Sequence, residues 1–355
     1  MTASSRQNRF WRRGSAEVPT EPPPGLWAQN RERILTAVAG LPRLPWAVRL
    51  VVDEEGRDTG FAILRGRVPE AERAAFDFVA STHRLVGTME CWGFPRPEYS
   101  WAGESYALTP GEALDDRYLL PEVAACEAWA HGAREPEAFL PLDRPRFLMS
   151  PPDFVDVAAV REAAFGPWPD TPVAKRWDVI CAYSDTRDGE LEGNWSLGRR
   201  CVDVLARELG LRVLLLSRSG LPDVPDLPNV EVRPRLSHDE IMGCIARSRV
   251  TLMPHRMDPS PRIATESLAA GVPILVHSQI LSGWQYVDPE TGAFFEGAFD
   301  VASGALRCLS GEHRTLQWLE RSYGRDRAAE KLAADLRALG GADHLRYALP
   351  TSLFR

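Results

Sequence analysis

An acidic loop and the helix that follows it are the part of this chain best suited to bind an anionic ligand. Asp258 precedes a predicted helix start at Ser260 and Pro261, and Glu266 lies inside that helix. Serine is favoured as a helix N-cap, and proline is favoured at the first helical position. The amides and the dipole at such a start attract anions. The alternative is structural: Glu266 would pair with Arg262 one turn earlier, and Asp258 would only cap a turn.

The elements around this loop are predicted to be a strand, a helix and a second strand. Residues 250–253 are an apolar run closed by Pro254, as in a buried parallel strand. The helix stops at Gly271 and Pro273, and residues 274–276 form the next strand. In open α/β folds, loops at the carboxyl-terminal edge of the sheet bind ligands.

The same residues carry a family resemblance. The spacing Pro254-x3-Asp258-x7-Glu266, followed by Ala-Ala-Gly-Val-Pro at 269–273, resembles the donor-site signature of family 4 retaining glycosyltransferases of the GT-B fold. That family has Glu-x7-Glu and then Ala-x-Gly-x-Pro. This chain has aspartate at the first acidic position and Pro261 where the family often has glycine. The resemblance covers roughly residues 174–310, and the segment 254–273 is its most specific part.

The resemblance implies an enzyme that transfers a sugar from a nucleotide-diphosphate sugar to an acceptor with retention of configuration. Glu266 would bind the ribose hydroxyls, and Asp258 would lie near the donor sugar. The diphosphate would lie at the helix start, beside Ser260 and Pro261. The departing phosphate would itself accept the proton of the acceptor, so no strong general base is expected. UDP or GDP is the nucleotide expected, without a cofactor or a bound metal.

Negative charge grows on the leaving diphosphate and requires a cation. The family usually places an arginine and a lysine just after the first strand of the donor domain. Here that place carries Ser184 and Arg187 and no lysine. We expect Arg187 to contact the phosphate, with Arg262 as the second choice beside Asp258 in the catalytic set. The alternative for Arg187 is an exposed loop arginine, and Arg199 is expected on an outer helix face.

Two further loops match the layout of the family. Arg235 and Leu236 follow the third strand of the donor domain, where contacts to the nucleobase would fall. Ser282 and Gly283 follow the strand 274–276, in the place of a glycine-bearing loop near donor and acceptor. Gly283 would let the backbone approach a ligand closely, although a turn glycine is also explained without a ligand.

On the acceptor side we single out His83, Arg84 and Glu90, which flank a predicted strand at 85–89. If the strand ends face the cleft, these side chains would orient an acceptor hydroxyl. A structural histidine is the alternative reading of His83. His255 is expected to line the cleft without a proton-transfer role, and no acidic or histidine cluster has metal-ligand spacing.

The predicted fold is α/β. The resemblance implies two facing Rossmann-like domains, of which the first is small and atypical here, and a C-terminal helix that returns to the first domain. Alternating strands and helices in the second half indicate a parallel, doubly wound sheet, with one helix capped by Ser237 and Glu240. Residues 121–132 are expected to be helical. The predicted boundaries are a flexible tail at 1–30, an acceptor-side domain at 31–150, a proline-rich linker at 151–175, a donor-binding domain at 176–310 and C-terminal helices at 311–355.

Composition limits the functional classes. The 355 residues are 44% hydrophobic and 26% charged, and the net charge of −7 does not suggest a broad nucleic-acid-binding surface. The six cysteines are scattered without a Cys-x2-Cys pair, so we expect neither a disulfide framework nor a zinc site. The chain has no apolar run long enough to cross a bilayer, and residues 1–30 lack the apolar core of a signal peptide, so a cytoplasmic location is expected. Lysine occurs only at Lys175 and Lys331, which is typical of a GC-rich bacterial genome.

Two other functions stay open at this stage. A GT-B protein can act on a sugar nucleotide as an epimerase. Alternatively, the aspartate at position 258 and the missing lysine are compatible with a non-catalytic binding or scaffold protein. Under the leading interpretation the partners are a sugar nucleotide and an unidentified acceptor, and turnover of the sugar nucleotide separates the classes.

Overall fold

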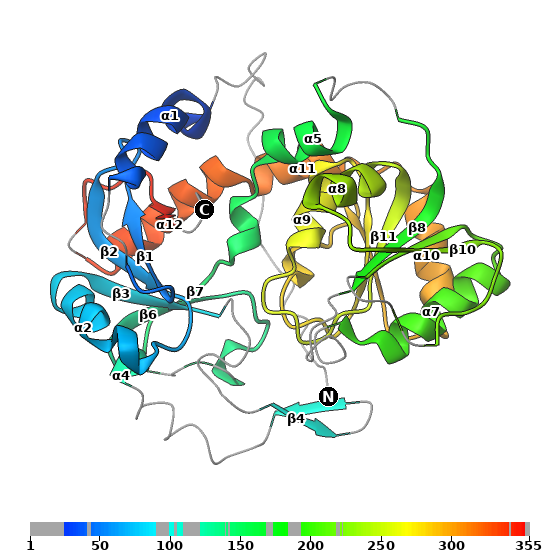
Figure 1. The fold of residues 1–355 in the computed structure, drawn as a ribbon, viewed down its shortest axis with the longest axis horizontal. Helices are drawn as coiled ribbons and strands as arrows, with labels where there is room; N and C mark the ends of the chain where they lie inside the picture. The colour runs from blue at the N-terminus through cyan, green and yellow to red at the C-terminus, as the bar shows by residue number, and fades with distance from the viewer. Residues whose placement is uncertain are drawn as a thin grey trace, which may run out of the picture.

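A computed structural model describes residues 25–40, 44–89, 99–102, 105–108, 121–138, 140, 143–167, 173–183, 193–217, 221, 223–340 and 342–351. Figure 1 shows two lobes side by side, each with a sheet at its centre and helices around it. The sequence candidates Glu90, Ser184 and Arg187 lie outside the described residues, as do residues 1–24 of the predicted tail.

The first lobe is built on a six-stranded sheet with the order β14-β1-β2-β3-β6-β7. Strands β2, β3, β6 and β7 are parallel, whereas β1 runs antiparallel to both of its neighbours. The central strands β3 and β6 are almost continuously buried, as expected for parallel strands covered on both faces. The elements of this lobe are α1 (Leu26–Ala39), β1 (Val48–Val52), β2 (Asp58–Leu64), η1 (Glu70–Glu72), α2 (Arg73–Thr82), β3 (Arg84–Thr88), β4 (Tyr99–Ala102), β5 (Ser105–Leu108), α4 (Pro121–Ala124), β6 (Cys126–His131), η2 (Pro136–Ala138), β7 (Arg146–Leu148) and β14 (Leu349–Pro350).

The helix predicted at 121–132 is wrong over most of its length. Only the four residues of α4 are helical, and β6 is a strand in the middle of the sheet. The sequence CEAWAH of β6 contains alanine, which favours helix by intrinsic propensity. Pairing with β3 and β7 and complete burial of Ala128 and Trp129 decide for a strand. Tertiary packing therefore outweighs local preference here.

The second lobe contains a parallel sheet with the order β10-β9-β8-β11-β12-β13. In chain order this is third, second, first, fourth, fifth, sixth, which is the order of a Rossmann-type doubly wound sheet. The strand order reverses between β8 and β11, and this switch point is where such sheets bind ligands. The elements are β8 (Trp177–Tyr183), α7 (Trp195–Arg207), β9 (Val213–Ser217), β10 (Val230–Pro234), α8 (His238–Ala246), β11 (Ser248–Met253), α9 (Arg262–Ala269), β12 (Ile274–His277), η4 (Trp284–Tyr286), β13 (Gly292–Phe295) and α10 (Val301–Ser310).

Helices cover both faces of this second sheet. On one face, α7 and α10 pack their apolar sides on alternate residues of the strands, such as Val179 and Leu215. On the other face, α8 and α9 pack on the intervening residues, such as Ile180 and Leu214. Because α8 and α9 share one face, their first turns lie near each other at the carboxyl-terminal edge of the sheet.

The chain crosses between the lobes twice. The first crossing runs through η3 (Pro151–Phe154) and α5 (Val157–Phe165), so the segment predicted as a linker contains a helix that packs against α8. The second crossing runs through α11 (Thr315–Ser322) into α12 (Arg325–Ala338). The latter packs against the first sheet, and β14 then pairs with β1, which confirms the predicted return of the C-terminal helix (Figure 1). Helix α1 begins at Leu26, inside the segment predicted as a flexible tail.

Candidate functional site

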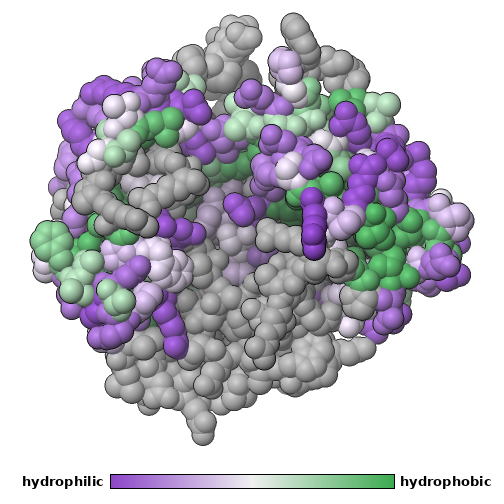
Figure 2. Space-filling view, in the orientation of Figure 1, coloured by the Kyte–Doolittle hydropathy of each residue, from purple (hydrophilic) through white to green (hydrophobic). Residues whose placement is uncertain are grey.

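A cavity of about 660 Å³ lies at the carboxyl-terminal edge of the second sheet and is lined from both lobes. One wall contains the loop 258–260 and the first turns of α8 and α9. Another wall is the η3–α5 segment, including Asp156. Arg65, which follows β2, and Arg325, which begins α12, complete the lining. Figure 2 shows the molecule hollowed between the two lobes.

The loop after β11 brings three of the predicted residues to this cavity: Asp258, Ser260 and Arg262. Helix α9 starts at Arg262 with Pro261 at the N-cap position, one residue later than predicted, and the side chain of Ser260 does not cap it. Instead, Asp258 Oδ1 accepts a hydrogen bond from the amide of Ser260 at 2.9 Å. The amide of Arg262 donates to the carbonyl of Ser260 at 2.8 Å.

These bonds change the expected anion site. Two of the amides at the helix start are already engaged within the loop, and Pro261 has no amide to donate. Arg262 is exposed and lines the cavity, so its guanidinium is the cation that this helix start presents to a ligand. Burial raises the pKa of Asp258, and His255, the Ser260 amide and Arg262 oppose that rise.

Glu266 is paired with a residue that the sequence analysis did not select. Its Oε1 lies 3.1 Å from Nε2 of His238, the first residue of α8. The Glu266 side chain is 16% exposed, the His238 side chain is 59% exposed, and both line the cavity. The bond to Glu266 raises the pKa of His238. Among the described ion pairs, Glu266 is therefore joined to His238 and not to Arg262, in contrast to the structural alternative considered from the sequence.

The backbone of His238 is fixed by the predicted capping box. The Ser237 side chain accepts from the amide of Glu240, and the Glu240 carboxylate accepts from the amide of Ser237. In the sequence this segment was notable only as a helix start. His238 meets Glu266 only because α8 and α9 are neighbours in the fold, and the local sequence pattern contains no signal for this pair.

The loop after β12 lies where the two lobes meet. Ser282 is completely buried, and a side chain on Gly132, at the end of β6, would collide with its hydroxyl. The indole of Trp284 donates to the carbonyl of Gly132 at 2.8 Å. Gly283 has a φ of +88°, and a Cβ there would stand 2.5 Å from Cγ of Pro261. Glycine is therefore required at position 283, where the loop packs against the start of α9.

The remaining donor candidates are further from the cavity. Arg235 has a φ of +54°, its amide donates to the carbonyl of Ser217, and its side chain is exposed. Leu236 packs on the core beside α8. Neither residue lines the cavity, so a contact of Arg235 or Leu236 with a nucleobase stays a prediction.

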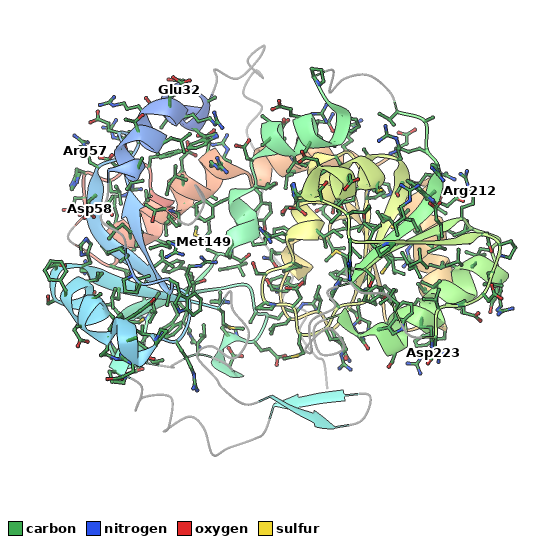
Figure 3. The ribbon with its side chains drawn as sticks, in the orientation of Figure 1. Glu32, Arg57, Asp58, Met149, Arg212 and Asp223 are labelled. Carbon is green, nitrogen blue, oxygen red and sulfur yellow. The ribbon has the colours of Figure 1, made fainter. Side chains whose placement is uncertain are left out.

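His83 and Arg84 are not among the residues that line the cavity, so their acceptor-side role stays a prediction. Strands bind ligands at their carboxyl-terminal ends, but these residues stand at the amino-terminal end of β3. His83 lies 2.8 Å from Asp58, which starts β2, whereas Arg65 at the other end of β2 lines the cavity. Figure 3 shows Asp58 at the outer margin of the first lobe.

Arg84 has a structural function in this position. Its guanidinium donates to Glu127 and to the carbonyls of Leu339 and Gly340 after α12. This placement is favourable because the last carbonyl groups of a helix carry partial negative charge, and the guanidinium of Arg84 is positive.

Three groups near the cleft escaped the sequence analysis. His131 ends β6 and is buried, and burial lowers its pKa to about 4. Asp153 of η3 is also buried, and burial raises its pKa to about 6. Its Oδ1 accepts a hydrogen bond at 2.6 Å from the hydroxyl of Tyr286, which belongs to the second lobe. Only the tertiary structure brings these groups together.

The described ranges lack both a metal-binding cluster and a membrane-spanning helix. They contain no group of three or more histidine, cysteine, aspartate or glutamate residues arranged to hold a metal ion. Over the same part of the chain, no helix combines the length and the apolar character needed to cross a membrane.

Comparisons with known proteins bear on the fold. No protein-family model matches the sequence, and no curated protein matches it. Among solved structures, the alpha,alpha-trehalose-phosphate synthase (UDP-forming) from Burkholderia vietnamiensis is similar with a TM-score of 0.51 at 11% sequence identity, over 79% of this chain and 74% of that chain. The enzyme from Burkholderia xenovorans, in complex with glucose-6-phosphate, has a TM-score of 0.50 at 11% identity, over 78% and 73%. At such identities the likeness establishes the fold, which is GT-B, as the sequence predicted.

Proposed function

We propose that the protein is a glycosyltransferase that transfers a sugar from a nucleotide-diphosphate sugar to an acceptor bound in the cleft. The observation that carries the proposal is the shared cavity of Asp258, Arg262 and Glu266 at the carboxyl-terminal edge of a Rossmann-ordered sheet. Such an edge, opposite a second lobe, is where open α/β folds bind nucleotides. A cavity of about 660 Å³ also lies within the size range of small-molecule sites.

Glu266 is suited to bind the ribose of the donor. Its Oε1 is held by His238, and within the described part of the chain no hydrogen bond engages its Oε2. An ionised carboxylate accepts hydrogen bonds only, so the ribose hydroxyls would donate to Oε2. Because the side chain is largely buried, this bond would be charge-assisted and weakly screened by water.

Arg262 and Asp258 would act at the leaving group and the sugar. The Arg262 guanidinium can neutralise negative charge on the diphosphate as the glycosidic bond breaks, together with Arg187 as predicted from the sequence. Asp258 stands three residues before Pro261, and burial raises its pKa. A carboxyl group that protonates more readily than an exposed aspartate can donate as well as accept a hydrogen bond to a sugar hydroxyl.

Retention of configuration is part of the proposal and follows the family resemblance. The bond between the anomeric carbon and the phosphate oxygen breaks, and the acceptor oxygen bonds to the same face of that carbon. The proton of the acceptor hydroxyl passes to the departing phosphate, so the products are a glycoside and a nucleoside diphosphate. UDP is the first nucleotide to test, because the two similar structures are UDP-forming synthases; GDP is the second.

The deciding experiment combines binding with turnover. Isothermal calorimetry with UDP and GDP should detect binding to the wild-type protein and at least tenfold weaker binding to Glu266→Ala, because a hydrogen bond to a charged group contributes roughly 1.5–3 kcal/mol. Arg199→Ala on the exposed face of α7 is the matched control and should bind as the wild type does. Equal affinity of Glu266→Ala and wild type would contradict the proposed ribose contact.

Incubation with UDP- and GDP-sugars then separates the functions. Release of the nucleoside diphosphate with a new glycoside supports a transferase. Conversion of the donor sugar into its epimer would identify an epimerase. Tight binding without any turnover would favour a binding or scaffold protein.

A further inference from the structure

His238 occupies a place in the cavity that no feature of the fold requires. The capping box of α8 is made by Ser237 and Glu240, so the side chain of His238 is not needed to start the helix. Its imidazole nevertheless lies within hydrogen-bond distance of Glu266 and lines the same cavity. The side chain is 59% exposed, so it adds little to the hydrophobic core.

We propose that His238 is a positioning residue for nucleotide binding: its imidazole holds one oxygen of the Glu266 carboxylate so that the other oxygen meets the ribose, and its protonation strengthens binding of a nucleoside diphosphate. The inference rests on the proposed function of the same cavity. Nε2 fixes Oε1 of Glu266 at 3.1 Å, which leaves the carboxylate little rotational freedom about its last torsion. A fixed acceptor loses less entropy when the nucleotide binds.

The charges around His238 determine the direction of the pH effect. Asp239, on the same helix, lies 3.8 Å from Nδ1 of His238. From α9, Glu266 raises the pKa of His238 and Arg262 lowers it. The other charged groups that line the cavity are Asp156, Asp258, Arg65 and Arg325. The hydrogen bond to Glu266 and the charges of Glu266 and Asp239 outweigh burial and Arg262, and the pKa of His238 is therefore raised above 6.5. This happens although a helix N-terminus disfavours a cation.

The direction in which pH changes nucleotide affinity follows from the charge of the His238–Glu266 pair. Below the pKa of His238, the imidazolium and the Glu266 carboxylate sum to zero charge. Above it, the pair carries one negative charge, which repels a diphosphate in the same cavity. Affinity for a nucleoside diphosphate should therefore be full at low pH and fall as pH rises through the pKa of His238. One added charge a few ångströms from a diphosphate, in a partly solvated site, corresponds to a fall of roughly threefold to tenfold.

The experiment measures UDP affinity by calorimetry at pH 6, 7 and 8 for the full chain and three variants. His238→Gln keeps an amide donor for Glu266 but does not titrate, so it should bind UDP at pH 8 and lose the protein-dependent part of the pH profile. His238→Ala lacks the donor and does not titrate either, so it should bind about five- to tenfold more weakly than His238→Gln at every pH. His83→Gln removes a histidine that is also paired with a carboxylate, but on the outer margin of the first lobe, and should leave the profile unchanged.

The outcomes separate the two levels of inference. UDP itself titrates in this range, and its own contribution is the profile that remains in His238→Gln. If the wild-type protein binds UDP and His238→Gln and His238→Ala both follow the wild-type curve, the positioning role is overturned and the proposed function stands. If the wild-type protein binds neither UDP nor GDP, the proposed function fails first. Circular dichroism of each variant confirms the fold, which the exposure of position 238 should preserve.

Discussion

Removing one hydroxyl at the joint between the lobes should destabilise the protein in a pH-dependent way. Tyr286 donates at 2.6 Å to Asp153, and its oxygen also lies 3.1 Å from the hydroxyl of Ser150. Tyr286 and Asp153 are both buried; Tyr286 belongs to the second lobe and Asp153 to the segment that crosses between the lobes. Tyr286→Phe deletes this donor while preserving the ring, which packs edge-on against Tyr323 with centroids 5.0 Å apart. The change therefore tests the hydrogen bond and leaves the ring packing in place.

The magnitude follows from the pKa of Asp153. Burial raises it from 3.8 to about 6, and the Tyr286 hydroxyl opposes the rise. The difference corresponds to about 3 kcal/mol, by which ionisation of Asp153 disfavours the folded state. Because the folded-state pKa of Asp153 is raised, the folded protein has its full stability below pH 3.8, where Asp153 is protonated in both states. That stability falls as pH rises through about 6. Without the phenol the pKa rises further, so the variant should lose about 1.5–3 kcal/mol at pH 8, where the lost bond is to a carboxylate, and about 1 kcal/mol at pH 5.

Urea unfolding followed by circular dichroism at pH 5 and pH 8 provides the assay. The control is Tyr323→Phe, whose hydroxyl makes only a 3.5 Å contact with the carbonyl of Gln285 and should change stability little at either pH. An equal loss at both pH values in Tyr286→Phe would refute the reasoning, because it would mean that the ionised carboxylate is not the partner of the hydroxyl.

Two further predictions concern Gly283 and the sequence candidate Arg187. Gly283→Ala should destabilise the protein by about 2 kcal/mol or more in urea unfolding, because both the φ of Gly283 and its contact with Pro261 exclude a side chain. The control Gly210→Ala, at a φ of +63° with open space around it, should cost only about 1 kcal/mol. Arg187→Ala should lower kcat on the order of a hundredfold once a donor and an acceptor are identified, with Arg199→Ala near normal. A normal kcat in Arg187→Ala beside a severe loss in Arg262→Ala would move the phosphate contact to α9.

The strands of the second sheet could be predicted from the sequence, whereas β2 and β6 of the first sheet could not, for a physical reason. Strands such as β8 and β9 are short apolar runs bounded by polar loops, and buried parallel strands require that composition. In the first lobe, β2 reads DTGFAIL and β6 reads CEAWAH, with glycine, alanine and charged residues that weaken the strand signal. Their pairing partners decide the outcome, and these partners are distant in the sequence.

The candidate site divides in the same way. Asp258 and Glu266 could be selected because a continuous segment carries both of them and leads into one helix. The pair of Glu266 with His238 joins residues 28 apart and arises only because α8 and α9 lie on one face of the sheet. His83 stands apart from the cavity because of the strand direction: a residue that precedes a parallel strand lies at the sheet edge opposite to the carboxyl-terminal edge, where ligands bind.

The loop after β12 explains why the second lobe alone does not define this site. Gly283 packs against Pro261 at the start of α9, and Trp284 donates to Gly132 at the end of β6. Tyr286, at the end of the same short segment, binds Asp153 in the joint between the lobes. One loop therefore contacts the helix that carries Glu266, the first sheet and the crossing segment. The position of α9 relative to the cavity consequently depends on how the two lobes are held together, and a change at the joint should alter the proposed binding of ribose by Glu266.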